Sequence, residues 1–530
     1  MSEPPGPTTA GPTTAGPTTA SPTTGAPEAP PRHTGLLVVA ALLLVAGAAA
    51  RLVGIDGSLW QDEFGTLWIV EAGPGTQGGA SGPGQVLERS RVFSAQGPLY
   101  YWLVALAVSA LGESELVLRL PSLLCGALAA LTLMAAGREL HSPRAGLLAG
   151  TVLWLTPAAI QLDRAARPYS LAMWGAALML TGYLRAVRSG AGRDRLLFAA
   201  GGVLVFHAQP FLALQALGYP LAHALIPALR QRYRQRDLWL DAGLQLLLAL
   251  PLAPRLFAVW SGHVAWTPAW HAPLHLLALH LALLPVLLLP GVRQALRPRS
   301  DRTRLLWVLL LAHLGAILCA VPLANLLMPR WFLDALLPAS LLVALGLAGL
   351  EATPGRRLAP ALLLGFGLLA LHSWRTGGPG TEFGFWQQDW RGAVARMEAA
   401  VGAEPEALVL FRSGFLEADR VLQGETHPGT VAGQDARGIL AALRSPGRAF
   451  PPWRVVVLPF SVGHPAAGAY YQRAIAPLLP GRRRVWVFAF EHPEQADEVV
   501  AWLEAADPGW TREDLRTPAG VYVGAALERP

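Results

Sequence analysis

Two adjacent carboxylates, Asp62 and Glu63, lie in the segment 57–68, GSLWQDEFGTLW, between tryptophans at 60 and 68. A carboxylate can take a proton from a hydroxyl group and so act as a general base when it lies within hydrogen-bond reach of that hydroxyl. The same acids could also be polar residues of a solvated loop that cap a short helix. The choice between these interpretations depends on where the rest of the chain places the segment.

The composition is that of a membrane protein. Of the 530 residues, 53% are hydrophobic and 15% are charged, whereas charged residues make up about 25% of an ordinary soluble domain. Several apolar runs reach the roughly 18 to 20 residues that cross a bilayer. We expect spans at residues 34–54, 116–137, 145–161, 169–186, 196–209, 211–229, 238–257, 273–290, 305–323, 331–349 and 358–373.

The arginines give the chain an orientation. All 42 basic residues are arginine, and 17 of them fall in alternate loops, whereas six fall in or beside the opposite loops. Because cytoplasmic loops carry an excess of basic residues, the larger set predicts the cytoplasmic side. The N-terminus is then cytoplasmic, and Asp62 and Glu63 lie outside. The larger set is Arg138, Arg144, Arg185, Arg188, Arg193, Arg195, Arg230, Arg232, Arg234, Arg236, Arg293, Arg297, Arg299, Arg302, Arg304, Arg356 and Arg357.

The apolar segment 98–112 does not fit this alternation. If it crossed the membrane, every later arginine cluster would fall outside, so we expect it to lie along the outer face or to re-enter it. The predicted fold class is an α-helical polytopic membrane protein of about 11 spans, in a range of roughly 10 to 13. Juxtamembrane helices occupy its first outer loop.

Three domains are expected. Residues 1–34, with a repeat of Pro, Thr, Gly and Ala, predict a disordered cytoplasmic tail. Residues 35–375 form the multi-span domain. Residues 376–530 predict a soluble α/β domain outside the membrane, because an amphipathic helix at 389–401 is followed by the strand-like runs EALVLF, WRVVVLPF and RRVWVFAF.

The outer ends of the spans bring acids, arginines, histidines and aromatic rings to one side of the membrane, where we expect them to surround one cavity. Arginine can hold an anion in a bidentate fork, and the aromatic rings either line a groove or belong to an interfacial belt. The segments concerned are AQGPLYYW (95–102), LDRAARPYSL (162–171), FHAQP (206–210), WSGHVAWTPAWH (260–271) and LMPRWF (327–332). In the loop 260–271, Trp266, Trp270 and His271 are candidates for stacking on a sugar.

Three of these stretches together resemble a known family. They are the acid pair after the first span, the stretch QGPLYYWLVALAVSALGESELVLRLPS, and the turn ARPYSL (166–171). In order and spacing they are similar to the C-type (GT-C) superfamily of integral-membrane glycosyltransferases. The closest branch holds the dolichyl-phosphate-mannose–protein mannosyltransferases and the lipid A aminoarabinose transferase. The resemblance covers roughly residues 55–190.

The resemblance implies a reaction and roles for particular residues. Members of the family move a sugar, with inversion, from a polyprenyl-phosphate carrier to a lipid, glycan or protein acceptor outside the cytoplasm. It implies a hexosyl- or pentosyltransferase in a bacterial-type inner (plasma) membrane. Asp62 falls at the position of the family's base, with Glu63 as helper or local structure. The implied donor phosphate ligands are Arg164, Arg167 and Arg330, and the residues lining the sugar, lipid or acceptor are Tyr100, Tyr101, Asp163, Tyr169 and His207.

The chain departs from the family at two positions. Gln96 stands where relatives often have Lys or His before the Pro-Leu-Tyr, and Ala165 replaces an acid two residues before the arginine of ARPY. Both departures bear on how the phosphate is held.

Other functions are weaker predictions. A secondary transporter would show internal repeats and ionisable residues near the bilayer midplane, and Asp241, Arg255 and Asp334 lie near the ends of their runs instead. A non-catalytic envelope protein that binds glycan through residues 376–530 is the third possibility. No His, Cys or acid cluster predicts a metal, and no basic-aromatic module indicates nucleic-acid binding.

Overall fold

The computed structural model describes residues 34–71, 80–93, 96–210, 212–252, 272–282, 296, 300–324, 329–351, 357–378, 390–401, 407–412, 453–458, 466–490, 493–514 and 522–528. Residues 1–33 of the predicted tail 1–34 lie outside these residues, as does the predicted sugar-stacking loop 260–271.

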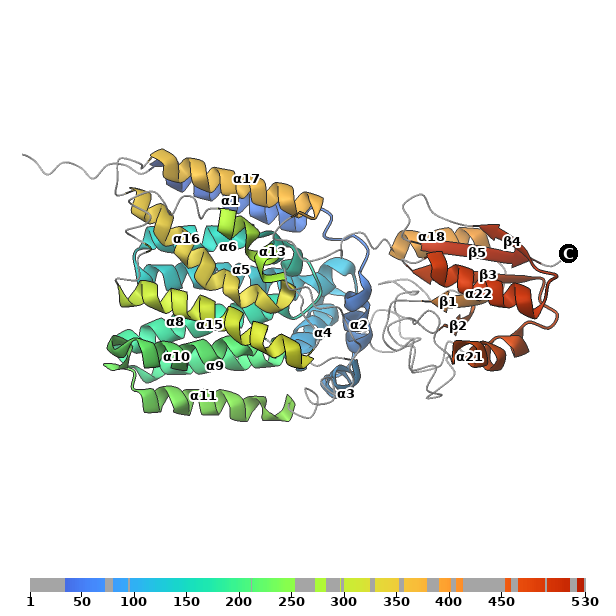
Figure 1. Ribbon diagram of the computed structural model, residues 1–530, viewed down its shortest axis with the longest axis horizontal. Helices are drawn as coiled ribbons and strands as arrows, with labels where there is room; N and C mark the ends of the chain where they lie inside the picture. Colours follow the sequence, from blue (N-terminus) through green and yellow to red (C-terminus); the bar gives the residue numbers. More distant parts are fainter. Residues whose placement is uncertain are drawn as a thin grey trace, which may run out of the picture.

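Roughly parallel helices form the larger part of the molecule (Figure 1). Helices α5 and α8 pack against each other and against α6 and α9 at its centre, and α1 lies beside α17 at its edge. The helices of this bundle are α1 (Thr34–Leu52), α5 (Glu115–Leu140), α6 (Pro143–Leu155), α7 (Pro157–Asp163), α8 (Tyr169–Ser189), α9 (Gly192–Ala208), α10 (Gly218–Leu225), α11 (Gln235–Ala249), α13 (Ala272–Ala282), α15 (Asp301–Ala324), α16 (Leu336–Glu351) and α17 (Leu358–Thr376), with short 3-10 turns at η1 (Leu212–Leu217), η2 (Pro227–Arg230), η3 (Leu250–Leu252) and η5 (Pro329–Ala335).

Glycines let these helices approach closely. A side chain at Gly146 of α6 would have its Cβ 2.2 Å from the carbonyl oxygen of Met134 on α5. One at Gly201 of α9 would lie 2.4 Å from the backbone nitrogen of Met179 on α8. Membrane helices associate through such small residues because lipid provides no hydrophobic driving force between them.

Four of the described helices are long and apolar enough to cross a membrane: Gly35–Leu52, Glu115–Leu140, Phe332–Leu350 and Leu358–Thr376. The pair Pro143–Leu155 and Pro157–Asp163, bent by 68°, makes a fifth if it is one broken span. Pro157 begins the second helix of this pair, where a proline disrupts the preceding helical ladder. The chain is an integral membrane protein, and the total of about 11 spans stays a prediction.

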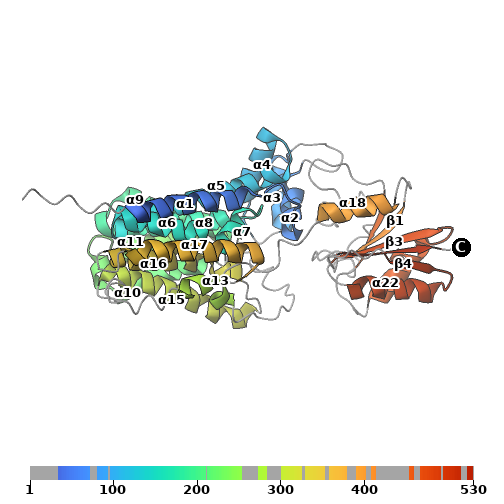
Figure 2. The same ribbon diagram turned by 90° about the horizontal axis from the view of Figure 1, so that it is seen from above.

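Three short helices gather at one end of the bundle (Figures 1 and 2). They are α2 (Gln61–Val70), α3 (Pro83–Phe93) and α4 (Leu99–Leu111). With 13 residues, α4 rises about 20 Å at 1.5 Å per residue, which is less than the hydrocarbon thickness of about 30 Å. The apolar segment 98–112 is therefore too short to cross as an upright helix.

The C-terminal residues form a five-stranded sheet of order β2-β1-β3-β5-β4. Its strands are β1 (Leu408–Arg412), β2 (Arg454–Val457), β3 (Arg484–Phe490), β4 (Thr511–Asp514) and β5 (Tyr522–Glu528). Strands β2, β1 and β3 are parallel, and β5 is antiparallel to β3 and β4. The first three strands coincide with the three apolar runs that suggested an α/β domain, apart from Arg412 at the end of β1.

Helices cover both faces of this sheet. Helix α18 (Trp390–Val401) lies on one side and α22 (Pro493–Ala506) on the other, and α21 (Ala467–Ala474) packs near β2. The C-terminal domain sits beyond the end of the bundle that carries α2, α3 and α4 (Figure 2). That end of the bundle also carries Asp62 and Glu63.

Candidate active site

Helix α2 gives the two adjacent acids different surroundings. The helix begins at Gln61, so Asp62 and Glu63 both lie in its first turn. Successive residues of an α-helix point about 100° apart. Asp62 therefore points to one side of α2, where it is partly exposed, while Glu63 points into the protein and is fully buried.

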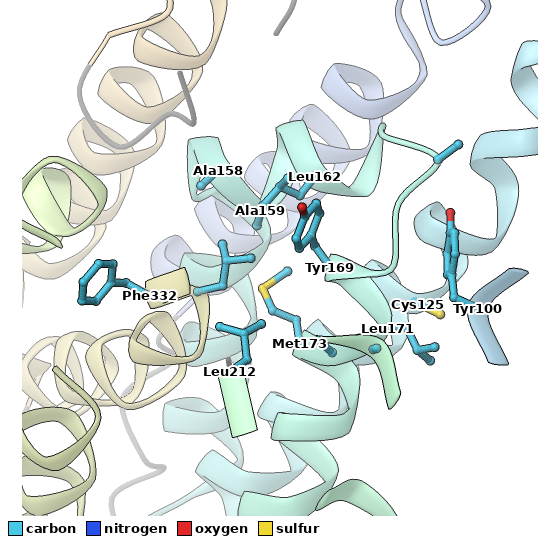
Figure 3. Close-up of a cluster of buried hydrophobic side chains, with 14 of the residues drawn as sticks. Tyr100, Cys125, Ala158, Ala159, Leu162, Tyr169, Leu171, Met173, Leu212 and Phe332 are labelled. Atoms are coloured by element: carbon cyan, nitrogen blue, oxygen red, sulfur yellow. The ribbon is translucent and has the colours of Figure 1, made fainter. Parts of the chain in front are cut away.

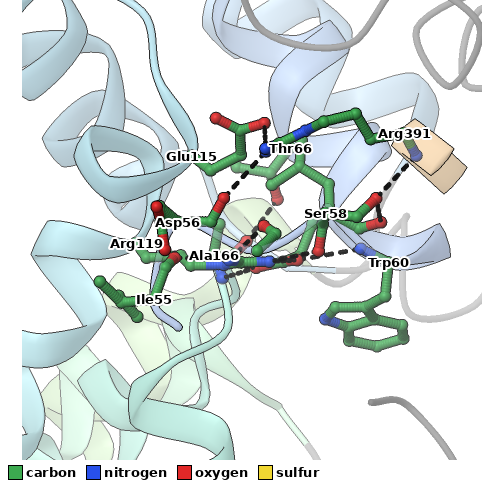
Figure 4. Close-up of polar contacts among 12 residues, drawn as sticks. Ile55, Asp56, Ser58, Trp60, Thr66, Glu115, Arg119, Ala166 and Arg391 are labelled. Atoms are coloured by element: carbon green, nitrogen blue, oxygen red, sulfur yellow. Dashed lines mark hydrogen bonds and ion pairs between the residues drawn. The ribbon is translucent and has the colours of Figure 1, made fainter. Parts of the chain in front are cut away.

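Four N–H groups donate to the Glu63 carboxylate, and Figure 4 labels the three residues that supply them, Arg119, Trp60 and Ala166. Arg119 of α5 donates from Nε to Oε1 at 2.8 Å and from Nη2 to Oε2 at 2.6 Å. The backbone N–H of Trp60 donates to Oε2 at 3.0 Å, and that of Ala166 donates to Oε1 at 2.6 Å. The Trp60 bond is the N3-to-N-cap half of a capping box, which fixes where α2 begins.

Arg119 also holds the segment that precedes α2. Its Nη1 donates to the carbonyl oxygens of Ile55 at 2.6 Å and Gly57 at 2.8 Å, and its Nη2 donates to that of Ser58 at 2.9 Å. One guanidinium thus joins α5, the segment 55–58 and α2. Because both charges are buried, we assign Glu63 and Arg119 a structural function.

Asp62 faces two arginines from distant parts of the chain. Its Oδ2 lies 3.9 Å from Nη2 of Arg167 and 3.6 Å from Nη1 of Arg330. The side chain of Asp62 is 31% exposed, whereas those of Arg167 and Arg330 are 8% and 13% exposed. These distances exceed the 2.7–2.9 Å typical of a charge-assisted hydrogen bond, so Asp62 is held loosely between the two cations.

The side chain of Tyr169 lies under both cations. The Cζ atom of Arg167 lies 5.9 Å and that of Arg330 5.7 Å from the centre of its ring. Figure 3 shows Tyr169 in a buried apolar cluster with Ala159, Leu162 and Met173. The aromatic floor is therefore rigid, because its back is packed in the core of the bundle.

Helix α4 and the segment before it support Arg167. Gln96 Oε1 accepts hydrogen bonds from Arg167 Nη2 at 3.3 Å and from the Tyr101 hydroxyl at 3.0 Å. The Tyr100 hydroxyl is 2.7 Å from Ser122 Oγ, which donates to the Arg167 carbonyl oxygen at 3.0 Å. Both tyrosines are fully buried. They position the arginine turn and do not form an interfacial belt.

Arg167 keeps its positive charge although its side chain is buried. Burial lowers its pKa, but the coulombic effects of Tyr101 and of the Asp62 carboxylate more than offset burial, and the net pKa lies above the usual value for arginine. Arg167 is therefore a permanent cation at the bottom of the site.

Two of the predicted site residues lie elsewhere. Arg164 donates from Nη1 to Ala50 O at 3.1 Å and from Nη2 to Val53 O at 2.7 Å, so it caps the C-terminal end of α1. Burial, followed by the nearby charge of Arg119, lowers its pKa to about 10. Asp163 is buried and ion-paired with Arg51 at 2.6 Å. These contacts indicate structural positions for both residues and not a place beside Asp62.

His207 lies near the site but does not reach it through any contact that the structure gives. Its Nε2 is 3.3 Å from the carbonyl oxygen of Leu248, and its own carbonyl accepts from the Gly97 N–H at 2.7 Å. A Cβ at position 97 would lie 2.6 Å from His207 Nδ1. His207 therefore packs against the backbone next to Gln96. In the described part of the chain, no group of three or more His, Cys, Asp or Glu side chains could hold a metal ion.

Sequence reasoning missed the partners of the buried acids. Arg119 sits inside an apolar helix, and an arginine in such a place indicates a buried ion pair. The arginine is visible in the sequence SELVLRLPS, but its partner 56 residues away is not. The same holds for Arg51 and Asp163, which are 112 residues apart.

A comparison with protein families extends these observations. Residues 95–287 match the sequence model of the family described as dolichyl-phosphate-mannose-protein mannosyltransferase. Over these residues the chain is similar to the C-type integral-membrane glycosyltransferases. The predicted resemblance is thereby confirmed. No curated protein sequence matches the chain.

Solved structures share the C-type glycosyltransferase fold. ArnT from Cupriavidus metallidurans in the apo state matches with a TM-score of 0.53 at 12% identity, over 92% of this chain and 97% of ArnT. The same ArnT bound to undecaprenyl phosphate matches with a TM-score of 0.54 at 13% identity, again over 92% and 97%. At this identity the similarity shows the fold alone.

The geometry explains one departure from the C-type glycosyltransferase pattern. Gln96 cannot supply a positive charge, but it orients Arg167 through its side-chain oxygen. Arg330 of η5 brings a second cation to the same carboxylate. Two arginines thus face the site even though position 96 is neutral.

The buried ion pair makes a stability prediction. Glu63→Gln keeps the shape of the side chain but leaves the Arg119 charge without its carboxylate, and we expect it to lower the free energy of unfolding by about 3–5 kcal/mol. The matched change Asp301→Asn, in an exposed pair 3.8 Å from Arg304, should cost less than about 1 kcal/mol. Thermal unfolding of the purified variants in detergent measures both. Equal shifts would show that the buried pair does not hold the fold.

Proposed function

We propose that the protein is a hexosyl- or pentosyltransferase that moves a sugar, with inversion, from a polyprenyl-phosphate carrier to an acceptor hydroxyl on the extracytoplasmic side of the membrane. Asp62 is the general base, and Arg167 and Arg330 hold the donor phosphate. The acceptor is a lipid, a glycan or a protein. The membrane is a bacterial-type inner membrane.

The contrast between the two adjacent acids carries the proposal. Glu63 is saturated by donors at 2.6 to 3.0 Å, so its lone pairs are committed to the fold. Asp62 is partly exposed, and its nearest cationic nitrogens lie at 3.6 and 3.9 Å. Of the pair, Asp62 has both the access and the lone pairs that a base needs.

The two arginines suit a departing phosphate. As the acceptor oxygen bonds to the anomeric carbon, its proton passes to the Asp62 carboxylate. The bond from the anomeric carbon to the phosphate oxygen breaks, and its electron pair leaves with the polyprenyl phosphate. Guanidinium groups fixed beforehand on the Tyr169 ring would stabilise that developing charge without reorganising. A phosphate anion would also compete with Asp62 for the cations, which would leave the carboxylate available to the acceptor.

The donor class and the side of the membrane rest on two further supports. The fold is shared with ArnT, which has been solved with undecaprenyl phosphate bound, and a lipid phosphate of that kind suits two arginines at a bundle end. The arginine distribution favours an extracytoplasmic place for the end that carries α2, α3 and α4.

Asp62→Asn tests the base. We expect the turnover number to fall by about 100-fold or more, because general base catalysis contributes about 10²–10⁴-fold. The matched control is Asp56→Asn, since Asp56 is an exposed acid in the segment before α2. The assay follows release of undecaprenyl phosphate from undecaprenyl-phosphate-linked hexoses and pentoses, in membranes that contain the native acceptors. Full activity of the Asp62 variant would remove it as the base.

Arg167→Gln and Arg330→Gln test the phosphate contacts. Each change removes one charge-assisted interaction, and we expect each to raise the KM for the lipid donor by about 10–100-fold. The control is Arg302→Gln, because Arg302 contacts the Leu140 carbonyl oxygen elsewhere in the bundle. If the donor KM stayed unchanged in both variants, the phosphate would bind elsewhere.

A further inference from the structure

The C-terminal domain touches the helix that carries Asp62. Trp390, the first residue of α18, is fully buried. Its ring lies 5.8 Å from that of Phe64 on α2 and 6.1 Å from that of Phe411 on β1. Phe64 is two residues beyond Asp62. One tryptophan therefore joins the sheet of the C-terminal domain to α2, the helix that carries Asp62. We call the C-terminal domain the outer domain, because the proposed orientation places it outside the membrane.

Arg391 binds the segment that leads into α2 (Figure 4). Its backbone N–H donates to Ser58 Oγ at 3.1 Å, and its Nη2 donates to the Asp56 carbonyl oxygen at 2.8 Å. The same nitrogen is ion-paired with Glu115 in the first turn of α5. The contact thus ties the outer domain to both α5 and the segment before α2.

The segment 55–58 is held from two sides. Arg119 binds the carbonyl oxygens of Ile55, Gly57 and Ser58 from the bundle, while Arg391 binds Asp56 and Ser58 from the outer domain. Glu115 and Arg119 are one helical turn apart on α5, so both arginines anchor to the same helix end. Asp62 follows this segment by four residues.

We propose that Trp390 and Arg391 are positioning residues for the transfer reaction, and that the outer domain sets the placement of Asp62 through α2. This inference rests on the proposed function of Asp62. Neither side chain has a described contact with Asp62, Arg167 or Arg330, so both act through the backbone of 55–58 and through the Phe64 ring. A small displacement of a catalytic group can cost about 100-fold in rate, which makes such coupling consequential.

The experiment compares Arg391→Ala and Trp390→Ala with Arg483→Ala, an exposed arginine of the same domain. Hydrogen exchange of the α2 peptide 61–70 in detergent measures positioning without any need for activity. We expect exchange to rise by about 10-fold or more in the first two variants and to stay at the wild-type level in the third. The turnover number should fall by about 10–100-fold, with the donor KM within about threefold of wild type because Arg167 and Arg330 keep their supports.

Arg391→Lys keeps the charge that faces Glu115 but has no planar fork for the Asp56 carbonyl, so it should recover part of the turnover. It also tests the same contact if Arg391→Ala does not elute as a folded protein in gel filtration. Unchanged exchange of α2 and unchanged turnover in an active Arg391→Ala enzyme would overturn the inference. Raised exchange in that variant, with a wild-type protein that releases no undecaprenyl phosphate, would support the coupling and overturn the proposed function.

Discussion

The buried ion pair between Glu63 and Arg119 fixes the architecture of the candidate site. Its two hydrogen bonds, at 2.6 and 2.8 Å, join α2 to α5, and the remaining donors tie in the Ala166 turn and the segment before α2. Breaking such a pair on one side leaves an unpaired buried charge, which is strongly unfavourable. The position of Asp62 depends on this pair because it is the fully buried charged link between α2 and α5. The Thr66 hydroxyl of α2 adds a second buried bond, to the Ala166 carbonyl oxygen at 2.7 Å.

Adjacency on a helix gives two like charges two different environments. The helical twist sends Glu63 into the protein and Asp62 toward Arg167 and Arg330. The fold supplies those cations from η5 and from the turn between α7 and α8, which lie far apart in sequence. The C-terminal domain contacts the same region through Trp390 and Arg391. The bundle and the C-terminal domain therefore meet at the helix that carries the proposed base.

Much of the fold followed from local pattern, and much of the site did not. Apolar runs lie close to α1, α5, α8, α9, α15, α16 and α17 because lipid-facing helices must be apolar along their length. The family resemblance brought Asp62, Arg167 and Arg330 into one hypothesis, and the structure places them together. The family resemblance could not distinguish the role of Glu63 from that of Asp62, or the role of Arg164 from that of Arg167, because neighbouring residues on a helix or turn differ in the direction in which their side chains point. The partners Arg51, Arg119 and Arg391 depend on contacts between residues more than 50 positions apart, which no local pattern encodes.

The most direct test of this account is a structure of the protein with an undecaprenyl-phosphate-linked sugar bound. The account predicts that the phosphate lies between Arg167 and Arg330, with an Asp62 oxygen within hydrogen-bond reach of an acceptor oxygen that is about 3–3.5 Å from the anomeric carbon. It also predicts that Glu63 keeps its bonds to Arg119. A phosphate bound among the arginines at the opposite end of the bundle, or an anomeric carbon facing away from Asp62, would contradict the central claim.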